Sequence, residues 1–393
     1  MALSKSKRIE SIDLLRGAVM IIMALDHVRD YFHKDAFVFD PTDLGKTSGI
    51  LFFTRWITHF CAPIFVFLAG VSARLNSYGK SRAELSFFLF TRGIWLMVAE
   101  ILIVTLEWTF NPHYSVLILQ VIWAIGASMV ILALLIRLPM RLILLIGLLL
   151  VFGHNLLDTT HVPGNTGGAF FWSLLHDRKV FHVGDLVILV GYPILPWLGI
   201  MVLGYCAGNL YSRDYDPVKR KKTLAWMGLG AIALFVIVRA INIYGDPSHW
   251  VARERPVLTL LSFLNTTKYP PSLLYILMTI GPALIFLAYG EVTLNAFTGK
   301  IAVFGRVPMF YYILHIVLIH ALAILAAVLT GYKWTDMVLA SWVTDSPQLK
   351  GYGFSLSFVY LLWIVMILVL YPFCKWYDQY KRSHREKWWL SYF

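Results

Sequence analysis

Residues 8–30 read Arg8-Ile-Glu-Ser-Ile-Asp13-Leu-Leu-Arg16-Gly17-Ala-Val-Met-Ile-Ile-Met-Ala-Leu-Asp26-His27-Val-Arg29-Asp30. The stretch has the length of a membrane span, yet it carries more charge than a span normally tolerates. Ionisable groups are costly inside a bilayer, so they usually mark a functional path. At about 100° per residue, one helix face of roughly 100° collects Asp13, Arg16, Met20, Met23, His27 and Asp30. The pattern predicts a helix that forms the wall of an active site within the membrane.

Composition places the whole chain in a membrane. Its 393 residues are 59% hydrophobic and 14% charged, whereas a soluble domain carries about 25% charged residues. Long apolar runs recur from one end to the other without an internal repeat, so we expect a single all-α membrane domain over residues 1–393. The net charge of +12 would suggest a nucleic-acid partner only in a soluble protein. Here we attribute it to loops, and we expect no nucleic acid.

Ten apolar runs are long enough to cross a bilayer. They cover residues 9–32, 52–74, 87–107, 115–136, 140–157, 184–210, 223–243, 271–290, 304–329 and 354–377. With the N-terminus inside, the inner loops hold more than twice as many Lys and Arg as the outer loops, which is the bias of cytoplasmic segments. We therefore expect about ten transmembrane helices, both termini in the cytoplasm and a location in the inner membrane. The outer loop 158–183 has a length that is usual for functional or disordered loops.

His27 is the first candidate for chemistry. A neutral imidazole near pH 7 can take a proton from a hydroxyl or an amine and return it to a leaving group. Asp30 lies one turn further along the same face and is expected to fix the tautomer of the ring, whereas Asp26 lies about 100° around the helix. His59 enters the second span at a similar depth, so a histidine pair is possible. The alternative is a buried structural histidine that a neighbouring helix satisfies.

Arg16 lies about 16 Å from His27 along the helix, toward the cytoplasmic end. A guanidinium there can hold phosphate or pyrophosphate through bidentate hydrogen bonds. The alternative is an ion pair with Asp13, three residues earlier, and the two roles are compatible. No spacing typical of a zinc site is present, and neither is a phosphate-binding loop or a dinucleotide fingerprint, so no metal is expected.

The first helix and three later stretches carry a resemblance to a known family. Arg8 to Asp30, followed by Ala62-Pro63-Ile-Phe-Val-Phe-Leu-Ala-Gly70, resembles bacterial relatives of heparan-α-glucosaminide N-acetyltransferase. Two later stretches look like further motifs of those relatives: Pro196-Trp-Leu-Gly-Ile-Met-Val-Leu-Gly204-Tyr and Gly305-Arg-Val-Pro-Met-Phe-Tyr-Tyr-Ile-Leu-His315. The resemblance is densest over residues 8–130. It implies a multi-span enzyme that moves acetyl from cytoplasmic acetyl-CoA to a glucosamine on the far side.

A second resemblance concerns the first helix alone. Ile12-Asp13-Leu-Leu-Arg16-Gly17, with a histidine eleven residues after the arginine, is similar to the acyltransferase-3 membrane O-acyltransferases. That similarity implies functional roles for Arg16 and His27. In the N-acetyltransferase family the catalytic histidine lies in the first outer loop, which leaves His27, His33 and His59 as candidates. Neither resemblance predicts the identity of the acceptor substrate.

Together these observations predict a membrane acyltransferase. Acyl-CoA, most simply acetyl-CoA, is expected to place its phosphates near Arg16 and Asp13. His27, with Asp30, Asp26 and His59 as further candidates, is expected to act as general base on an outer sugar hydroxyl or amine. The expected partners are membrane lipids and a glycan or small-molecule acceptor, with a homodimer possible. The competing class is a transporter or lipid-binding protein that uses the charged helix as a proton relay.

Overall fold

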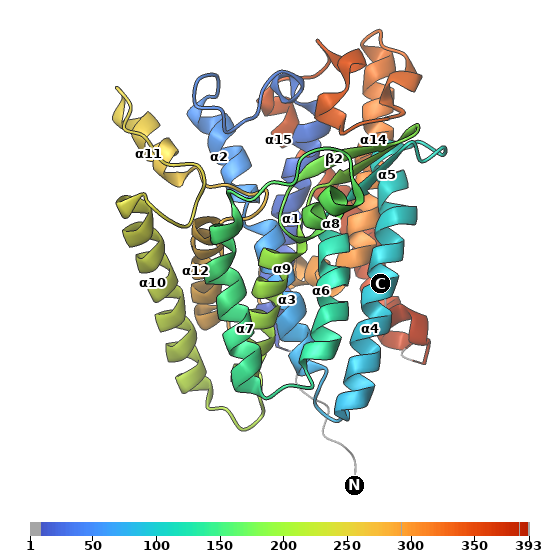
Figure 1. Cartoon of the computed structure of the whole chain (residues 1–393). Helices are drawn as coiled ribbons and strands as arrows, with labels where there is room; N and C mark the ends of the chain where they lie inside the picture. Colours follow the sequence, from blue (N-terminus) through green and yellow to red (C-terminus); the bar gives the residue numbers. More distant parts are fainter. Residues whose placement is uncertain (1–8, 292, 385, 392–393) are drawn as a thin grey trace.

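A computed structural model describes residues 9–291, 293–384 and 386–391 (Figure 1). Most of the long helices run in one general direction and form a bundle, while the strands gather at one end of it (Figure 1). We call that end the sheet end and the opposite end, where the first helix begins, the base. The predicted cytoplasmic residues 1–8 and the last two residues lie outside the described part of the chain.

The α-helices provide most of the structure. They are α1 (Glu10–Phe32), α2 (Gly49–Thr58), α3 (Cys61–Leu75), α4 (Arg82–Ala99), α5 (Thr105–Thr109), α6 (Val121–Leu135), α7 (Met140–Gly153), α8 (Gly167–Leu175), α9 (Ile194–Ala207), α10 (Pro217–Ile241), α11 (Pro256–Leu264), α12 (Leu273–Tyr289), α13 (Ala296–Arg306), α14 (Pro308–Leu329) and α15 (Leu356–Ser383). Single turns of tighter or wider helix connect or extend them: η1 (Lys34–Phe37), η2 (Glu100–Val104), η3 (His154–Leu157), η4 (Gly208–Tyr211), η5 (Trp334–Met337), η6 (Val343–Asp345), η7 (Pro347–Leu349) and η8 (Trp388–Ser391).

The polytopic membrane character predicted from composition is confirmed. Within the described residues, seven helical segments are long and apolar enough to cross a membrane: Gly49–Leu75, Arg82–Thr109, Met140–Leu157, Ile194–Tyr211, Pro217–Ile241, Pro308–Leu329 and Leu356–Ser383. The helices α6 and α12 are apolar but shorter. Each of these nine segments overlaps one of the predicted spans, and α1 fills the remaining one. The charges of α1 set it apart from the others, as its sequence indicates.

The prediction of an all-α chain is wrong in one place. The predicted spans 115–136 and 184–210 each begin with a β-strand, β1 (Val116–Leu119) and β3 (Leu186–Val190). β3 pairs in parallel with β1 and antiparallel with β2 (Lys179–Val183), in the order β1-β3-β2. These runs are short and rich in Val, Ile and Leu, and periodicity alone cannot separate such a strand from a buried helical segment. Gly184, at φ 60°, and Asp185 form the two-residue turn of the β2–β3 hairpin.

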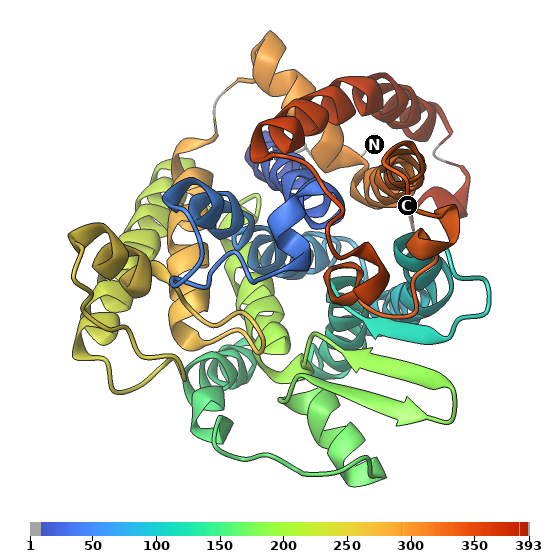
Figure 2. The same ribbon diagram turned by 90° about the horizontal axis from the view of Figure 1, so that it is seen from above.

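The charged helix α1 lies inside the bundle. It packs against α2, α3, α13, α14 and α15, and from above it is surrounded by other helices (Figure 2). Two glycines let α1 and α13 approach backbone to backbone, because a Cβ at Gly17 would lie 2.1 Å from the Ile301 carbonyl oxygen and one at Gly305 would lie 1.9 Å from that of Asp13. This burial supplies protein partners for the charges of α1, which a lipid-facing helix would lack.

Candidate active site

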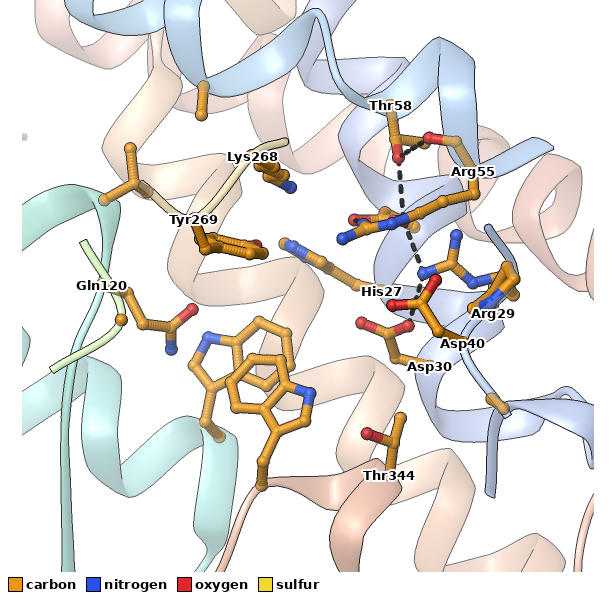
Figure 3. Close-up of a pocket in the computed structure, with 18 of the residues that line it drawn as sticks. His27, Arg29, Asp30, Asp40, Arg55, Thr58, Gln120, Lys268, Tyr269 and Thr344 are labelled. Carbon is orange, nitrogen blue, oxygen red and sulfur yellow. Dashed lines mark hydrogen bonds and ion pairs between the residues drawn. The ribbon is translucent and has the colours of Figure 1, made fainter. Parts of the chain in front are cut away.

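A cavity of about 360 Å³ lies at the sheet end, beside the second half of α1. Its walls come from segments far apart in the sequence: α1, the residues after η1, the α2–α3 junction, α5, the ends of β1 and β3, the α11–α12 loop and η6. The polar and charged residues that line it are Asp26, His27, Arg29, Asp30, Asp40, Arg55, Thr58, Gln120, Arg178, Tyr192, Lys268, Tyr269, Tyr312, Thr344 and Asp345 (Figure 3). Charge of both signs is therefore concentrated in one volume of an otherwise apolar bundle.

His27 is the only one of the three candidate histidines that lines this cavity. The Nδ1 atom of His27 lies 2.8 Å from Nε2 of His315, which projects from α14. The edge of Trp108 from α5 meets the His27 ring, with 4.8 Å between the ring centroids. Figure 3 shows the ring directed toward Tyr269 and Lys268 on the far wall. A neighbouring helix and an aromatic side chain thus hold the imidazole in one orientation.

The hydrogen bonds of His315 assign the proton of His27. Nδ1 of His315 lies 2.9 Å from the Tyr311 carbonyl oxygen, which can only accept, so this nitrogen carries the proton. In a neutral His315 ring, Nε2 is then an acceptor, and it receives the Nδ1–H of His27. Nε2 of a neutral His27 is consequently unprotonated. Nε2 of His27 therefore has a free lone pair and can accept a proton, as a general base must. His315 is the residue that sets the tautomer of His27.

The expectation that Asp30 orients His27 is wrong. The Asp30 carboxylate accepts a hydrogen bond from Arg29 at 2.6 Å, and Asp26 pairs with Arg29 at 2.7 Å and with Arg55 of α2 at 2.5 Å. The hydroxyl of Thr58 also donates to Asp26. Opposite charges at these distances attract far more strongly than a neutral imidazole does. Asp26 and Asp30 therefore belong to a buried ion-pair network in the cavity wall.

Loss of Arg29 is expected to destabilise the protein. Its side chain is 2% exposed, so Arg29→Leu would leave Asp30 without a cationic partner and should lower the free energy of unfolding by about 3–5 kcal/mol. Denaturation of the purified protein in detergent measures the change. The matched control is Lys46→Leu, which breaks an exposed pair with Asp43 and should change stability by less than about 1 kcal/mol. Equal stability of the two variants would contradict a structural role for the network.

His59 and His33 lie outside the cavity. His59 sits between α2 and α3, where its carbonyl oxygen accepts a hydrogen bond from the Tyr275 hydroxyl at 2.7 Å. His33 ends α1, and its Nε2 atom lies 3.9 Å from Asp35. Neither histidine lines the volume that His27 faces. The structure thus brings His27 together with His315 and keeps the other two candidates apart from it.

Arg16 joins three helices near the base. One Nη donates to the Gly305 carbonyl oxygen at 3.2 Å, the other donates to the Ser72 hydroxyl at 2.9 Å, and Asp13 lies 3.7 Å away. The predicted ion pair with Asp13 is confirmed. The Arg16 side chain retains 18% exposure, but it does not line the sheet-end cavity.

The cavity also contains residues that the sequence did not single out. Lys268 and Arg178 flank the ring of Tyr269, at 5.1 and 5.0 Å from its centroid. Burial raises the pKa of Tyr269, but Lys268, Arg55 and hydrogen bonds from Tyr192 and Lys268 outweigh it and lower the pKa to about 8. Trp108 and Trp342 also line the cavity, and their rings stack with 4.7 Å between centroids. These residues come from loops and short helices whose proximity no local pattern reveals.

The fold and the cavity together indicate a class of protein. A partly buried histidine that lines a charged cavity inside a polytopic membrane protein marks a functional site for proton chemistry, as in a membrane enzyme or a proton relay. Within the described residues, no group of three or more His, Cys, Asp or Glu side chains is arranged to hold a metal ion.

Comparison with known families identifies the chain further. Residues 8–243 match the family described as "Heparan-alpha-glucosaminide N-acetyltransferase, catalytic". The match covers more than half of the chain, so the protein belongs to this family, and the predicted resemblance to heparan-α-glucosaminide N-acetyltransferase is confirmed over residues 8–243. It includes His27 and the Asp26–Arg55 pair, whereas Lys268 and His315 lie beyond it. No curated protein matches the chain.

Proposed function

We propose that the protein transfers an acyl group, most simply acetyl, from cytoplasmic acyl-CoA to a sugar or glycan acceptor on the outer side of the membrane. Members of the family use acetyl-CoA. The observation that carries the proposal is the His27–His315 pair, which leaves His27 Nε2 able to accept a proton in a cavity lined by both charge signs. A purely structural histidine would not need to line a cavity.

In the proposed reaction, His27 acts as general base and then as general acid. Its Nε2 atom takes the proton from the acceptor hydroxyl or amine as the acceptor oxygen or nitrogen forms a bond to the thioester carbonyl carbon. The carbon–sulfur bond then breaks, and His27 returns the proton to the departing CoA sulfur. His315 keeps its own Nδ1 proton throughout, bound to the Tyr311 carbonyl oxygen. The acyl group leaves on the acceptor, and no net proton is gained or lost.

Other cavity residues fit this chemistry. Lys268 faces the same volume as His27 (Figure 3), where its charge would stabilise the negative charge that develops on the thioester oxygen. The stacked faces of Trp108 and Trp342 offer an apolar surface, as sugar rings and acyl chains require. The buried network around Arg29 holds Asp26 and Asp30 in place, so we assign these two carboxylates to the wall and not to proton transfer.

The test is incubation of the purified protein with labelled acetyl-CoA. Transfer of label to an added amino sugar, or slow hydrolysis in its absence, supports an acyltransferase. A proton-relay transporter would bind no acetyl-CoA and would show neither reaction, so retention of all label on CoA would refute the proposal.

We propose that α1, α6, α12 and the seven longer segments all cross the inner membrane, with both termini in the cytoplasm and loop 158–183 outside. The charge bias of the loops supports this orientation. A cysteine at the exposed Asn165, in a chain with Cys206→Ser, should then react with an impermeant maleimide in intact cells. A cysteine at Lys221, at the start of α10, should react only after the cells are broken open. The reverse pattern would invert the topology.

We propose that Arg16, with Asp13 beside it, contacts the phosphates of the donor. Arg16→Ala should then weaken CoA binding in calorimetry by about 10- to 150-fold, since a charge-assisted hydrogen bond contributes about 1.5–3 kcal/mol. Arg16→Lys should restore only part of the affinity, because lysine lacks the planar fork. Ser72→Ala removes one partner of Arg16 and serves as a packing control. Equal CoA affinity in wild type and Arg16→Ala would sink this assignment.

A further inference from the structure

A second cavity lies at the base, far from the site of His27. It has a volume of about 270 Å³ and is enclosed by the end of α3, the start of α4, the link between α6 and α7, and α9. None of its lining residues lines the first cavity. The proposed reaction assigns nothing to this place.

The polar side of this base cavity is strongly positive. Arg74, Lys80 and Arg82 line it together with the hydroxyls of Ser77 and Ser81, and no carboxylate does. The hydrogen bonds these cations make go to neutral acceptors: Arg74 to the Asn209 side chain, Lys80 to the Asn76 carbonyl and Arg82 to the Arg137 carbonyl. In the described part of the chain, no carboxylate oxygen lies within 4.0 Å of a side-chain nitrogen of any of the three. Glu84 lies outside the lining, where it accepts a hydrogen bond from the Ser81 backbone and attracts Lys80. The lining itself holds three cations and no carboxylate, which favours an anion in the cavity.

The other side of the cavity is aliphatic. Leu85, Ile136, Leu138, Met140 and Ile143 line it, so the cavity as a whole is amphipathic. Its level in the bundle is also informative. The apolar segment Arg82–Thr109 begins at this cavity, which places the cations where the hydrocarbon region meets the lipid headgroups. A phosphate ester joined to apolar chains matches this division of the lining.

We propose that the base cavity binds the phosphate headgroup of an acidic phospholipid from the inner leaflet, with its first methylene groups against the aliphatic side. Basic pockets between membrane helices on the cytoplasmic side recognise such headgroups. The phosphates of CoA share the same chemistry, but they are not joined to apolar chains that would occupy the aliphatic side. This inference rests on the geometry of the base cavity and on the proposed orientation of the bundle, and it is independent of acyl transfer.

Binding of phosphatidylglycerol to the purified full chain tests the proposal. Native mass spectrometry compares the number of phosphatidylglycerol molecules that stay bound with the number of phosphatidylcholine molecules. A titration then gives the affinity for phosphatidylglycerol. Each cation contributes about fivefold at such a surface, so the triple variant Arg74→Gln, Lys80→Gln, Arg82→Gln should bind phosphatidylglycerol about 100-fold more weakly. The matched control removes the same charge from the exposed start of α10, as Lys219→Gln, Lys221→Gln, Lys222→Gln, and should bind as the wild type does.

Further arms keep the test decisive. Arg74 also bonds Asn209, so the double variant Lys80→Gln, Arg82→Gln provides a measurement if the triple variant does not fold, with an expected loss of about 25-fold. Equal weakening in the α10 control would show that the charge of the base as a whole attracts the lipid, and would overturn the site. Calorimetry with CoA tests whether the phosphates of CoA, and not those of a lipid, occupy the base cavity. A loss of CoA affinity with phosphatidylglycerol binding intact would assign the cavity to the donor and overturn the lipid proposal.

Discussion

His27→Ala is expected to lower acyl transfer by roughly 10²- to 10⁴-fold, which is the usual contribution of positioned acid–base catalysis. The lost group is the Nε2 atom that, in the proposed reaction, carries the proton from the acceptor to the CoA sulfur. CoA affinity should survive, because Arg16 lies about 16 Å away along α1. Transfer of labelled acetyl and calorimetric CoA affinity, measured in parallel on folded protein, separate the two effects.

The neighbouring histidines provide the controls for this measurement. His33→Ala removes a buried histidine that does not line the cavity, and it should retain transfer activity once the protein is folded. A structural role for His27 would instead reduce folding yield and CoA affinity together. Full transfer activity in folded His27→Ala would eliminate it as the base and move the proposal to His59 or His33.

The architecture of the bundle was accessible from sequence because its signals are local. An apolar run of the right length predicts a membrane helix wherever it occurs, and α1 was distinguished by charges that lie within one segment. The strands β1 and β3 were missed because four or five apolar residues carry no periodicity that separates strand from helix. Their pairing joins Val116 to Val187, a contact between segments about 70 residues apart in the printed sequence.

The candidate site was accessible only in part for the same reason. His27 was found because it shares a helix face with other polar residues, whereas its partner His315 is separated from it by most of the chain. A single sequence does not show which helices pack together, so the contact between α1 and α14 could not be predicted from it. Asp30 shows the opposite error. It lies on the predicted face, but Arg29, next to it in sequence, provides a stronger partner than the imidazole.

The proposed role of His315 in setting the tautomer of His27 gives a second prediction. His315→Leu removes the acceptor for the Nδ1 proton of His27. The tautomer of His27 with an unprotonated Nε2 is then no longer stabilised by this hydrogen bond. We expect transfer to fall by roughly 10²-fold or more, since a wrong histidine tautomer is costly in general base catalysis. CoA affinity should change little, because His315 does not line either cavity. The measurement is again labelled transfer beside calorimetric CoA affinity.

A second substitution separates this positioning role from packing. In His315→Gln the amide oxygen can still accept the Nδ1 proton of His27, so this variant should recover a large share of the activity that leucine loses. A side chain needed only to fill space would behave in the opposite way. His315 is fully buried, and there leucine is accommodated more readily than an amide whose polar atoms need partners. Transfer that is higher in His315→Leu than in His315→Gln would therefore reject the assigned tautomer, and with it the proposal that His27 Nε2 is the proton acceptor.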